Sequence, residues 1–412
     1  MIKKIGILRE EKLPQDVRTP IVPSDCKKIM DEFPDIKIVV QPSNDRCFTN
    51  EEYIASGVEI NENIYDCDLL IGVKEVPLHY LIANKKYIFF SHTIKKQQHN
   101  LKLLQAFIDL NIEMIDYEAL TDEKGDRVIA FGYWAGIVGG FNALWTTQKR
   151  FNKKDIGRLY TVDSYDELKD NLDDLDFKKL KFVVTGTGRV AKGVIKVLQD
   201  AKIREVTPAE FLEQEFEEAV FTRLKSEEMF IPKFKHIQYS REEFHTKPLN
   251  FKSDFEKYTK VADVLINAIY WDPKAPKLFT LKEMKKNDFK IKVIADITCD
   301  IAPEASIPST IKATTIENPV FGFLPLREKM VDPFTRNAVD VMSIPNLPSE
   351  LPREASKDFS LKFKEIVLPE LLSSESEMIT NATITKSRKL TSKYLYLESF
   401  VYEDTFRASH IE

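Results

Sequence analysis

Leu69-Leu-Ile-Gly-Val-Lys74-Glu75 is one of three stretches in which an apolar run ends at reactive side chains. The other two are Tyr87-Ile-Phe-Phe-Ser-His92 and Ile112-Glu-Met-Ile-Asp-Tyr-Glu118. We expect the apolar runs to form buried strands over 69–73, 87–90 and 112–115. Open parallel sheets bind ligands at the carboxyl ends of their strands. The pattern therefore predicts a ligand-binding edge that carries Lys74, Glu75, His92 and Glu118.

The composition is that of a globular chain without a basic surface for nucleic acid. The 412 residues are 43% hydrophobic and 11% aromatic, and the net charge is −5, so we expect no nucleic-acid partner. No apolar run reaches about eighteen residues, and the first residues lack a signal-peptide pattern, so we expect no membrane span and a cytoplasmic location. The four cysteines are scattered without a Cys-x-x-Cys pair, which predicts free thiols and no metal site.

Strand and helix patterns alternate along the chain in two sets. The first set begins with expected strands over 4–8 and 36–40, and the second begins with a strand over 180–185. An apolar helix with four glycines, over 130–145, joins the sets. Such alternation predicts an α/β fold of two Rossmann-like, doubly wound parallel-sheet domains with a cleft between them, the second inserted into the first. We expect the first domain to span 1–130 and 324–412, and the second to span 131–323.

Three further segments have weaker patterns. Residues 210–229 are strongly charged with helical spacing, so we expect a helix there. Few strand signals follow residue 323, and residues 357–372 have the amphipathic spacing of a long helix. Residues 149–180 are charge-rich, which is typical of a solvated helical face.

The second set opens with a dinucleotide-binding pattern, Lys181-Phe-Val-Val-Thr-Gly186-Thr-Gly188-Arg189-Val190-Ala191. In such a strand–turn–helix unit, the first glycine permits the tight turn, and the second lets the backbone approach a pyrophosphate. Amide groups at the start of the helix, with Arg189 and Val190, are the candidate phosphate contacts. The pattern predicts NAD or NADP as cofactor.

The choice between the two cofactors stays open from the sequence. Glu205 lies 19 residues after Gly186, where an acid can bind the ribose of NAD, but Lys202 and Arg204 flank it and can meet a 2′-phosphate. Later strands are expected to end near the nicotinamide. Their candidate contacts are Asn267, Ala268, Asp296 and Asp300, with a turn-capping role as the alternative for Asn267.

Several motifs resemble those of the alanine dehydrogenase, transhydrogenase and lysine-forming saccharopine dehydrogenase superfamily. The N-terminal motifs are Ile5-Gly-Ile-Leu-Arg9-Glu10 and Asp16-Val-Arg18-Thr-Pro20. Longer motifs over 89–97, 115–118, 127–136 and 346–356 are similar to the lysine–ketoglutarate reductase half of the aminoadipic semialdehyde synthases. They are also similar to the stand-alone fungal saccharopine dehydrogenases. The resemblance covers most of the chain from residue 4 to about 372 and implies lysine metabolism.

The resemblance also implies a reaction and a set of roles. In that family, the ε-amine of lysine joins the ketone of 2-oxoglutarate, and a nicotinamide hydride reduces the imine. Lys74 and His92 match the acid–base pair, Glu75 and Glu118 match carboxylates that tune its charge, and Arg18 and Arg127 match the arginines that hold substrate carboxylates. The last of these roles suits the planar guanidinium, which binds a carboxylate through two hydrogen bonds.

Two alternatives remain, and neither fixes the oligomeric state. An alanine dehydrogenase-like enzyme would share the lysine and histidine but needs one carboxylate site, where saccharopine needs three. A non-catalytic nucleotide-sensing homologue would be expected to lack part of the Lys74, His92 and Arg18 set, which is intact here. The expected partners are an amino acid and a 2-oxo acid. A separate glutamate-forming saccharopine dehydrogenase is a further candidate, because this sequence has no counterpart of the synthases' second half.

Overall fold

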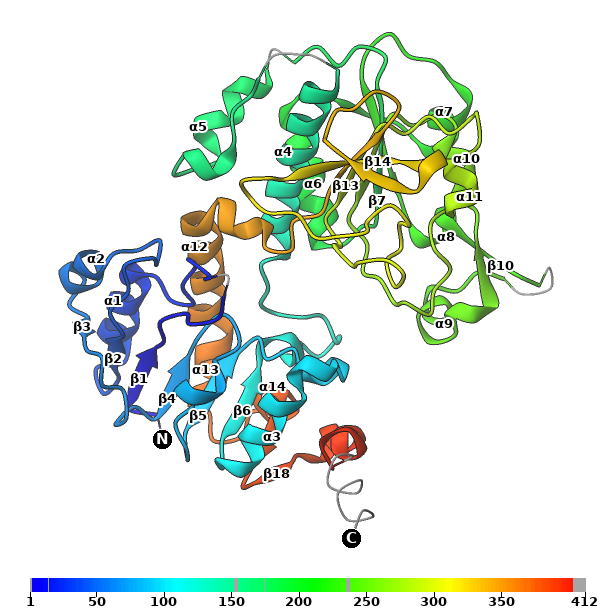
Figure 1. The fold of residues 1–412 in the computed structure, drawn as a ribbon. Helices are drawn as coiled ribbons and strands as arrows, with labels where there is room; N and C mark the ends of the chain where they lie inside the picture. The colour runs from blue at the N-terminus through cyan, green and yellow to red at the C-terminus, as the bar shows by residue number, and fades with distance from the viewer. Residues whose placement is uncertain (1, 14, 152–154, 174, 235–237, 403–412) are drawn as a thin grey trace. The chain divides into compact units, whose positions relative to one another are not determined.

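The computed structural model describes residues 2–13, 15–151, 155–173, 175–234 and 238–402. Two compact units divide the chain: a first unit of Met1–Ala130 with Pro352–Glu412, and a second unit of Phe131–Leu351. Each unit is built around its own eight-stranded sheet (Figure 1). The inserted arrangement of two α/β units agrees with the expected fold class. Residues 403–412, which the expected first domain includes, lie outside the described residues.

The sheet of the first unit has the order β18-β17-β6-β5-β4-β1-β2-β3. Its parallel strands are β1 (Lys4–Ile7), β2 (Lys37–Val40), β3 (Glu59–Ile60), β4 (Leu69–Ile71), β5 (Lys86–Phe89) and β6 (Glu113–Asp116). The antiparallel edge is β17 (Thr383–Lys386) and β18 (Lys389–Leu390). The expected strands of this unit are therefore confirmed to within one or two residues.

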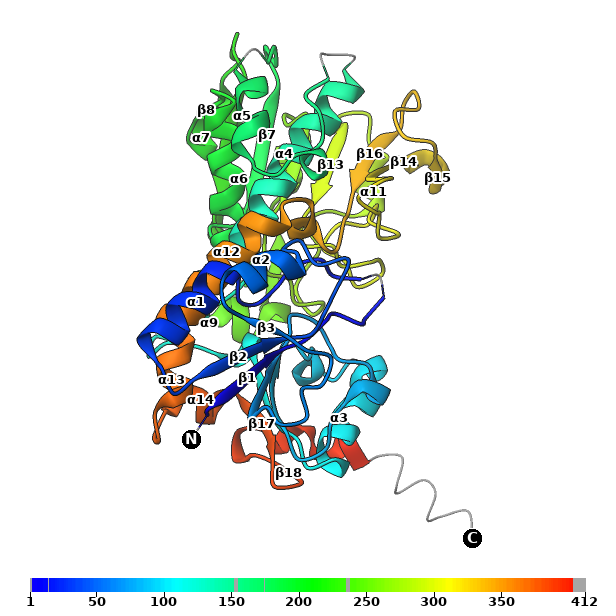
Figure 2. The same ribbon diagram turned by 90° about the vertical axis from the view of Figure 1, so that its left-hand side faces the viewer.

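The helices of the first unit come from both ends of the chain. They are α1 (Pro23–Glu32), α2 (Asn50–Ala55), α3 (Leu101–Asp109), α12 (Pro352–Lys362), α13 (Leu368–Leu372) and α14 (Glu377–Ala382). Figure 2 shows α1 and α12 side by side, and Ser360 Oγ joins them by accepting from the Val22 amide at 3.1 Å and donating to Asp25 at 2.7 Å. These buried hydrogen bonds fix the returning C-terminal segment onto the N-terminal one.

A π-helical segment, Phe363–Val367, separates α12 from α13. Pro369 lies in the first turn of α13 and has no amide hydrogen to continue the preceding helical ladder. A wider turn before a proline accommodates its ring. The expected helix over 357–372 therefore exists as one helical path with a local change of pitch.

The sheet of the second unit has the order β15-β14-β16-β13-β12-β7-β9-β8. Its parallel strands are β7 (Lys181–Thr185), β8 (Arg204–Glu205), β9 (Val220–Leu224), β12 (Val264–Asn267), β13 (Val293–Asp296) and β16 (Val339–Met342). The antiparallel strands β14 (Val320–Leu324) and β15 (Lys329–Val331) form one edge. The hairpin of β10 (Phe230–Pro232) and β11 (Phe251–Ser253) stands apart from this sheet.

Helices cover both faces of this second sheet (Figure 1). They are α4 (Gly132–Arg150), α5 (Asp166–Lys169), α6 (Arg189–Asp200), α7 (Pro208–Glu213), α8 (Ser226–Met229), α9 (Arg241–Thr246), α10 (Glu256–Thr259) and α11 (Leu281–Met284). Along β7, Phe182 and Val184 join the core under α4 and α6, whereas Val183 joins the core on the other face. Burial on both faces is typical of parallel strands.

Three sequence-based expectations about the chain after residue 210 are wrong. The segment 210–229 is not one helix, because β9 fills its middle and is buried at four of its five positions. The segment after residue 323 is not poor in strands, since β15 and β16 lie there in the second unit and β17 and β18 in the first. The boundary between the units lies after Leu351 instead of residue 323, because β16 pairs in parallel with β13.

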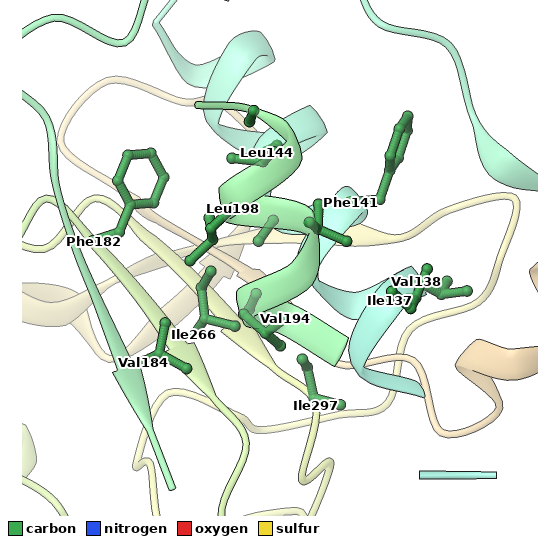
Figure 3. Close-up of a cluster of buried hydrophobic side chains, with 14 of the residues drawn as sticks. Ile137, Val138, Phe141, Leu144, Phe182, Val184, Val194, Leu198, Ile266 and Ile297 are labelled. Atoms are coloured by element: carbon green, nitrogen blue, oxygen red, sulfur yellow. The ribbon is translucent and has the colours of Figure 1, made fainter. Parts of the chain in front are cut away.

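Helices α4 and α6 pack tightly against each other in the second unit (Figure 3). A Cβ atom built on Gly136 of α4 would lie 2.0 Å from the Val190 carbonyl oxygen, and one on Gly193 of α6 would lie 2.2 Å from the Tyr133 carbonyl oxygen. Only glycine permits two backbones to approach so closely. The glycines of the expected crossover helix therefore hold α4 against the helix that follows the dinucleotide pattern.

We expect Gly136→Ala to lower the free energy of unfolding by about 3 kcal/mol or more, because the new methyl group meets backbone atoms that cannot rotate away. Gly132→Ala is the matched control on the same helix, since its Cβ would find its nearest neighbour at 3.5 Å, an ordinary contact. Thermal and denaturant unfolding of both variants measure the effect. Equal stability of the two variants would contradict this account of the packing.

Candidate functional site

The first unit brings Lys74, Glu75, His92 and Glu118 to one edge of its sheet. β4, β5 and β6 are parallel neighbours, with Ile71 level with Ile88 and Ile88 level with Ile115. Each of the four residues follows the carboxyl end of one of these strands. Parallel pairing thus assembles the expected edge from segments that are far apart in the sequence.

Glu75 and His92 form a hydrogen-bonded pair at this edge. His92 Nδ1 lies 2.7 Å from Glu75 Oε1, and Lys12 Nζ lies 2.7 Å from Glu75 Oε2. Burial opposes ionisation of Glu75, but the hydrogen bond and charge of His92 and Lys12 outweigh it and lower the pKa of Glu75 to about 2. A carboxylate on Nδ1 fixes the ring orientation and leaves Nε2 for proton exchange.

The backbone around His92 holds the ring in place. His92 adopts a left-handed conformation with φ of 53° directly after the Ser91 that follows β5, and Asn100 Nδ2 donates to its carbonyl oxygen at 3.0 Å. The Phe90 ring stacks against the imidazole with 6.3 Å between ring centroids. About a quarter of the His92 side chain, 27%, remains exposed. The imidazole is therefore fixed but accessible.

Lys74 lies beside Glu75, within a ring of charges. Its backbone amide donates to Glu10 Oε2 at 2.8 Å, and the preceding Val73 amide donates to Glu10 Oε1 at 2.6 Å. Burial, with the nearby Arg18 guanidinium, lowers the pKa of the Lys74 ammonium. Within the described part of the chain, no hydrogen bond or ion pair engages Lys74 Nζ. The amine is therefore available to a reacting group.

Glu10 is a site residue that the sequence reasoning quoted only as part of a motif. Its buried carboxylate holds the loop that carries Lys74 and Glu75. Burial and the nearby Asp16 carboxylate raise the pKa of Glu10. Glu10 could have been found from its position in the loop after β1, which pairs in parallel with β4. The loops that follow adjacent parallel strands lie close together.

Arg18 is held by its neighbour Asp16. Arg18 Nε lies 2.9 Å from Asp16 Oδ1, and Arg18 Nη2 lies 2.5 Å from Asp16 Oδ2, with only 4% of the arginine side chain exposed. Burial opposes ionisation of Asp16, but this ion pair lowers the pKa of Asp16 to about 2. Asp16 thus orients Arg18 in the absence of substrate. The positive charge of Arg18 also contributes to the lowered pKa of Lys74.

Glu118 and Arg127 lie at the β6 side of the edge. Glu118 Oε1 contacts Arg127 Nη2 at 3.3 Å and Lys95 Nζ at 3.1 Å. Burial opposes ionisation of Glu118, yet these cations lower its pKa. Asp116 anchors the same turn by accepting from the amides of Ser91 and Glu118 at 3.1 and 2.7 Å. Arg127 remains 39% exposed and can reach a second anion.

The dinucleotide pattern forms the expected strand, turn and helix. Gly186 has φ of +90°, and a Cβ on it would lie 2.9 Å from the Ala268 carbonyl oxygen. A Cβ on Gly188, the N-cap of α6, would find no protein atom within 4 Å. Arg189 and Val190 begin α6. The turn therefore leaves open space at the helix start, where a pyrophosphate fits.

A pocket of about 1280 Å³ opens at this turn, within the second unit. It lies at the carboxyl ends of β7, β9 and β12, which supply Gly186–Gly188, Lys225–Glu227 and Ala268–Asp272 respectively. The remaining wall comes mainly from Met229, Phe230, Tyr239, Arg241, Phe244, His245 and Pro248, most of them in a region where no element was predicted from the sequence. A volume of this size accommodates a dinucleotide.

Glu205 does not line that pocket. It lies on β8, the edge strand, level with Phe221 of β9, and its carboxylate is 3.6 Å from Arg223 Nε. The strand beside β7 is β9, with Leu224 level with Thr185. The sequence-based spacing therefore selected the wrong strand, because the short β8 precedes β9 in the chain but lies outside it in the sheet.

Asn267 and Asp296 are buried and bonded to each other at 2.8 Å. Asn267 also contacts Thr185 and Ser306, and Asp296 also accepts from Thr310 at 2.6 Å. These hydrogen bonds join β12 and β13 to β7. The role of Asn267 in this structure is therefore structural, as in the turn-capping alternative. Ala268, the residue directly after β12, lines the pocket. Asp300, in the loop after β13, is an electrostatic neighbour of Asp296.

Asp296→Asn should change how stability depends on pH. Burial raises the pKa of Asp296 to about 6, so the folded chain binds this proton more tightly than the unfolded chain. The resulting stabilisation is complete below about pH 4 and is lost as the pH rises through 6. The free energy of unfolding of the unmodified chain should therefore fall relative to the variant by about 1–3 kcal/mol between pH 4 and 7. A difference that does not change with pH would contradict the buried network.

Within the described residues, no helix is both long and apolar enough to span a membrane. The same residues contain no group of three or more His, Cys, Asp or Glu side chains placed to hold a metal ion.

Comparison with known proteins gives consistent relatives. Residues 6–138 match the alanine dehydrogenase/PNT N-terminal domain. The mitochondrial alpha-aminoadipic semialdehyde synthase of Rattus norvegicus is 29% identical over 446 residues, which cover 96% of this chain and 47% of the synthase. The lysine-forming, NAD(+) saccharopine dehydrogenase of Emericella nidulans is 26% identical over 387 residues, which cover 89% and 90% of the two chains.

Solved structures support the fold. An L-alanine dehydrogenase matches with a TM-score of 0.64 and 14% identity, over 97% of this chain and 99% of the other. The chain spans about half the length of the synthases that it matches. The resemblance expected from the motifs is thereby confirmed: the chain matches the alanine dehydrogenase/PNT N-terminal domain over residues 6–138 and is similar, along most of its length, to lysine-forming saccharopine dehydrogenases and aminoadipic semialdehyde synthases.

Proposed function

We propose that this protein is an NAD(P)-dependent oxidoreductase that joins lysine and 2-oxoglutarate reductively to saccharopine, and catalyses the reverse reaction. The observation that carries the proposal is the Lys74–Glu75–His92 edge, where the Glu75 carboxylate holds an accessible imidazole and is an electrostatic neighbour of a partly buried amine of lowered pKa. The similarity to saccharopine dehydrogenases over most of both chains supports it.

The proposed reaction needs proton transfers in both directions. The ε-amine of lysine adds to the ketone, a proton moves to the new hydroxyl, and water leaves to give an imine. His92 suits this exchange, because Glu75 orients its ring through Nδ1. Lys74, near Arg18 and Asp16, can polarise the ketone while charged or take up a proton once neutral.

Arginines at the edge suit the carboxylates of the proposed substrates. Arg18 is fixed by Asp16, and Arg127 is half-exposed beside Glu118. A guanidinium in a fixed orientation binds a carboxylate with little loss of conformational freedom. Two cationic anchors fit a large product with several carboxylates better than they fit alanine.

The second unit suits the nicotinamide cofactor. Gly186, Gly188 and the first residues of α6 would hold its pyrophosphate, because the turn leaves space there that a side chain would fill. When bound, the cofactor supplies the hydride that reduces the imine carbon. The groups of this chain then orient the reactants and carry the protons.

A substrate assay tests the proposal. Oxidation of NADPH or NADH is followed with lysine plus 2-oxoglutarate, with pyruvate plus ammonia, and with each component omitted. We expect oxidation only with the first complete mixture. Oxidation with pyruvate and ammonia alone would instead identify an alanine dehydrogenase-like enzyme. Dinucleotide binding without oxidation in either mixture would favour a nucleotide-sensing protein. A cytoplasmic location stays a prediction, to be checked by fractionation.

His92→Gln and Lys74→Met should each lower kcat about a hundredfold or more, the usual scale for loss of a proton-transfer group. Binding of the dinucleotide should stay unchanged, because both residues belong to the first unit. His79→Gln and Lys102→Met are matched controls on exposed surface of the same unit. Steady-state kinetics and direct titration separate the two readouts.

Near-normal turnover in either variant would remove that residue from the mechanism. A parallel loss in the control variants would show that the effect is not specific to the site. Thermal unfolding of all four variants identifies any loss of folded protein.

A further inference from the structure

The pocket of the second unit carries a cluster of cations at the carboxyl end of β9. Arg223 lies on that strand, Lys225 directly follows it, and Arg241 begins α9. All three line the same pocket as Gly186 and Gly188. In Figure 1, α8, α9 and β10 lie together beside this end of the sheet. We refer to Arg223, Lys225, Ser226 and Arg241 as the basic cluster.

The backbone places the basic cluster next to the glycine turn. β9 pairs with β7 so that Leu224 is level with Thr185, and the Gly186 amide donates to the Leu224 carbonyl oxygen at 2.9 Å. Lys225 and Ser226 therefore emerge beside Gly186. In dinucleotide-binding folds, the residues after this neighbouring strand meet the ribose of the adenosine half. The cluster thus occupies the position that distinguishes a 2′-hydroxyl from a 2′-phosphate.

The acids nearby leave the cations in excess. Glu228 is turned away, because its carboxylate accepts from the Lys225 backbone amide at 2.6 Å. Glu205 pairs with Arg223 only at 3.6 Å from Nε. Glu227 lines the pocket but lies 4.0 Å from Lys225 Nζ. For Arg241, the described residues provide no ion pair. Among the residues that line the pocket, the three cations of the basic cluster therefore outnumber the two carboxylates, which belong to Glu227 and, in the segment after β12, to Asp272.

Aromatic side chains line the pocket beside the cations, with Phe230 and Phe244 buried and Tyr239 partly exposed. Phe230 and Phe244 stack with 4.6 Å between their ring centroids, and both line the pocket with Tyr239. Flat apolar rings suit an adenine base, whereas the cations suit an anionic group attached close to it. The two features together match an adenosine that carries a phosphate on its ribose.

We propose that this chain selects NADP(H) over NAD(H), and that Lys225 and Ser226, with Arg223 and Arg241, bind the 2′-phosphate. A ribose phosphate carries close to two negative charges, and Lys and Arg side chains bind such a group through charge-assisted hydrogen bonds. A ribose diol, in contrast, offers these cations no anionic group. The inference rests on the proposed function, since it specifies the cofactor of that reaction.

Binding measurements test this selection without turnover. The full chain is titrated calorimetrically with NADPH and NADH, and then with adenosine 2′,5′-bisphosphate and adenosine 5′-monophosphate. We expect each 2′-phosphorylated ligand to bind at least about tenfold more tightly than its partner. Equal affinities, or tighter binding of NADH, would overturn the selection and leave the proposed function standing. Failure of both dinucleotides to bind would overturn the proposed function and this inference together.

Variants of the cluster locate the effect. Lys225→Gln should weaken NADPH binding about tenfold and leave NADH binding nearly unchanged, and Ser226→Ala should act in the same direction more weakly. Glu227→Gln should not weaken NADPH binding, because it removes a negative charge that would repel the 2′-phosphate. Lys252→Gln is the matched control, an exposed lysine of the same unit on β11 that does not line the pocket. Equal loss of both dinucleotides in Lys225→Gln would overturn the assignment to the 2′-phosphate.

Discussion

Parallel pairing of strands is the constraint on which both candidate sites depend. Neighbouring parallel strands have their carboxyl ends at the same edge, so the residues that follow them meet in space whatever their distance in the sequence. In the first unit this brings the loop after β1, with Glu10 and Asp16, to the Lys74–Glu75 loop after β4. In the second unit it joins the glycine turn to the residues after β9 and β12.

Two carboxylates at the edge of the first unit are buried in ion pairs, which keeps them ionised. Glu75 has His92 and Lys12, Asp16 has Arg18, and each carboxylate keeps a pKa near 2 despite burial. A buried charge without a partner would cost several kcal/mol and would neutralise instead. The pairing therefore orients side chains and fixes charge before substrate binds. Lys74 differs, because its ammonium interacts electrostatically with these groups but forms no hydrogen bond or ion pair among the described residues.

The sequence was sufficient where local pattern and tertiary position agree. The strands that carry Lys74, His92 and Glu118 were predicted within one or two residues, because each is a short apolar run bounded by polar residues. It failed at residues 210–229, where surrounding charges hid the strand Val220–Leu224. That error produced the misplacement of Glu205, since strand order in a sheet is set by long-range pairing that spacing along the chain does not encode.

The degree of burial distinguishes polar residues that can bind a ligand from polar residues that only stabilise the fold. The side chains of Asn267 and Asp296 are hydrogen-bonded to each other and to Thr185, Ser306 and Thr310. The exposed fraction of each residue is 1% or less, so neither is accessible to a ligand. His92 also has a carboxylate partner, yet a quarter of its side chain stays accessible. A polar side chain at a strand end is therefore informative about function only when its remaining hydrogen-bonding atoms face open space. By that criterion, Lys74, His92 and Arg127 in the first unit and the basic cluster in the second are the candidates to meet a ligand, and the buried acids around them determine their geometry and charge.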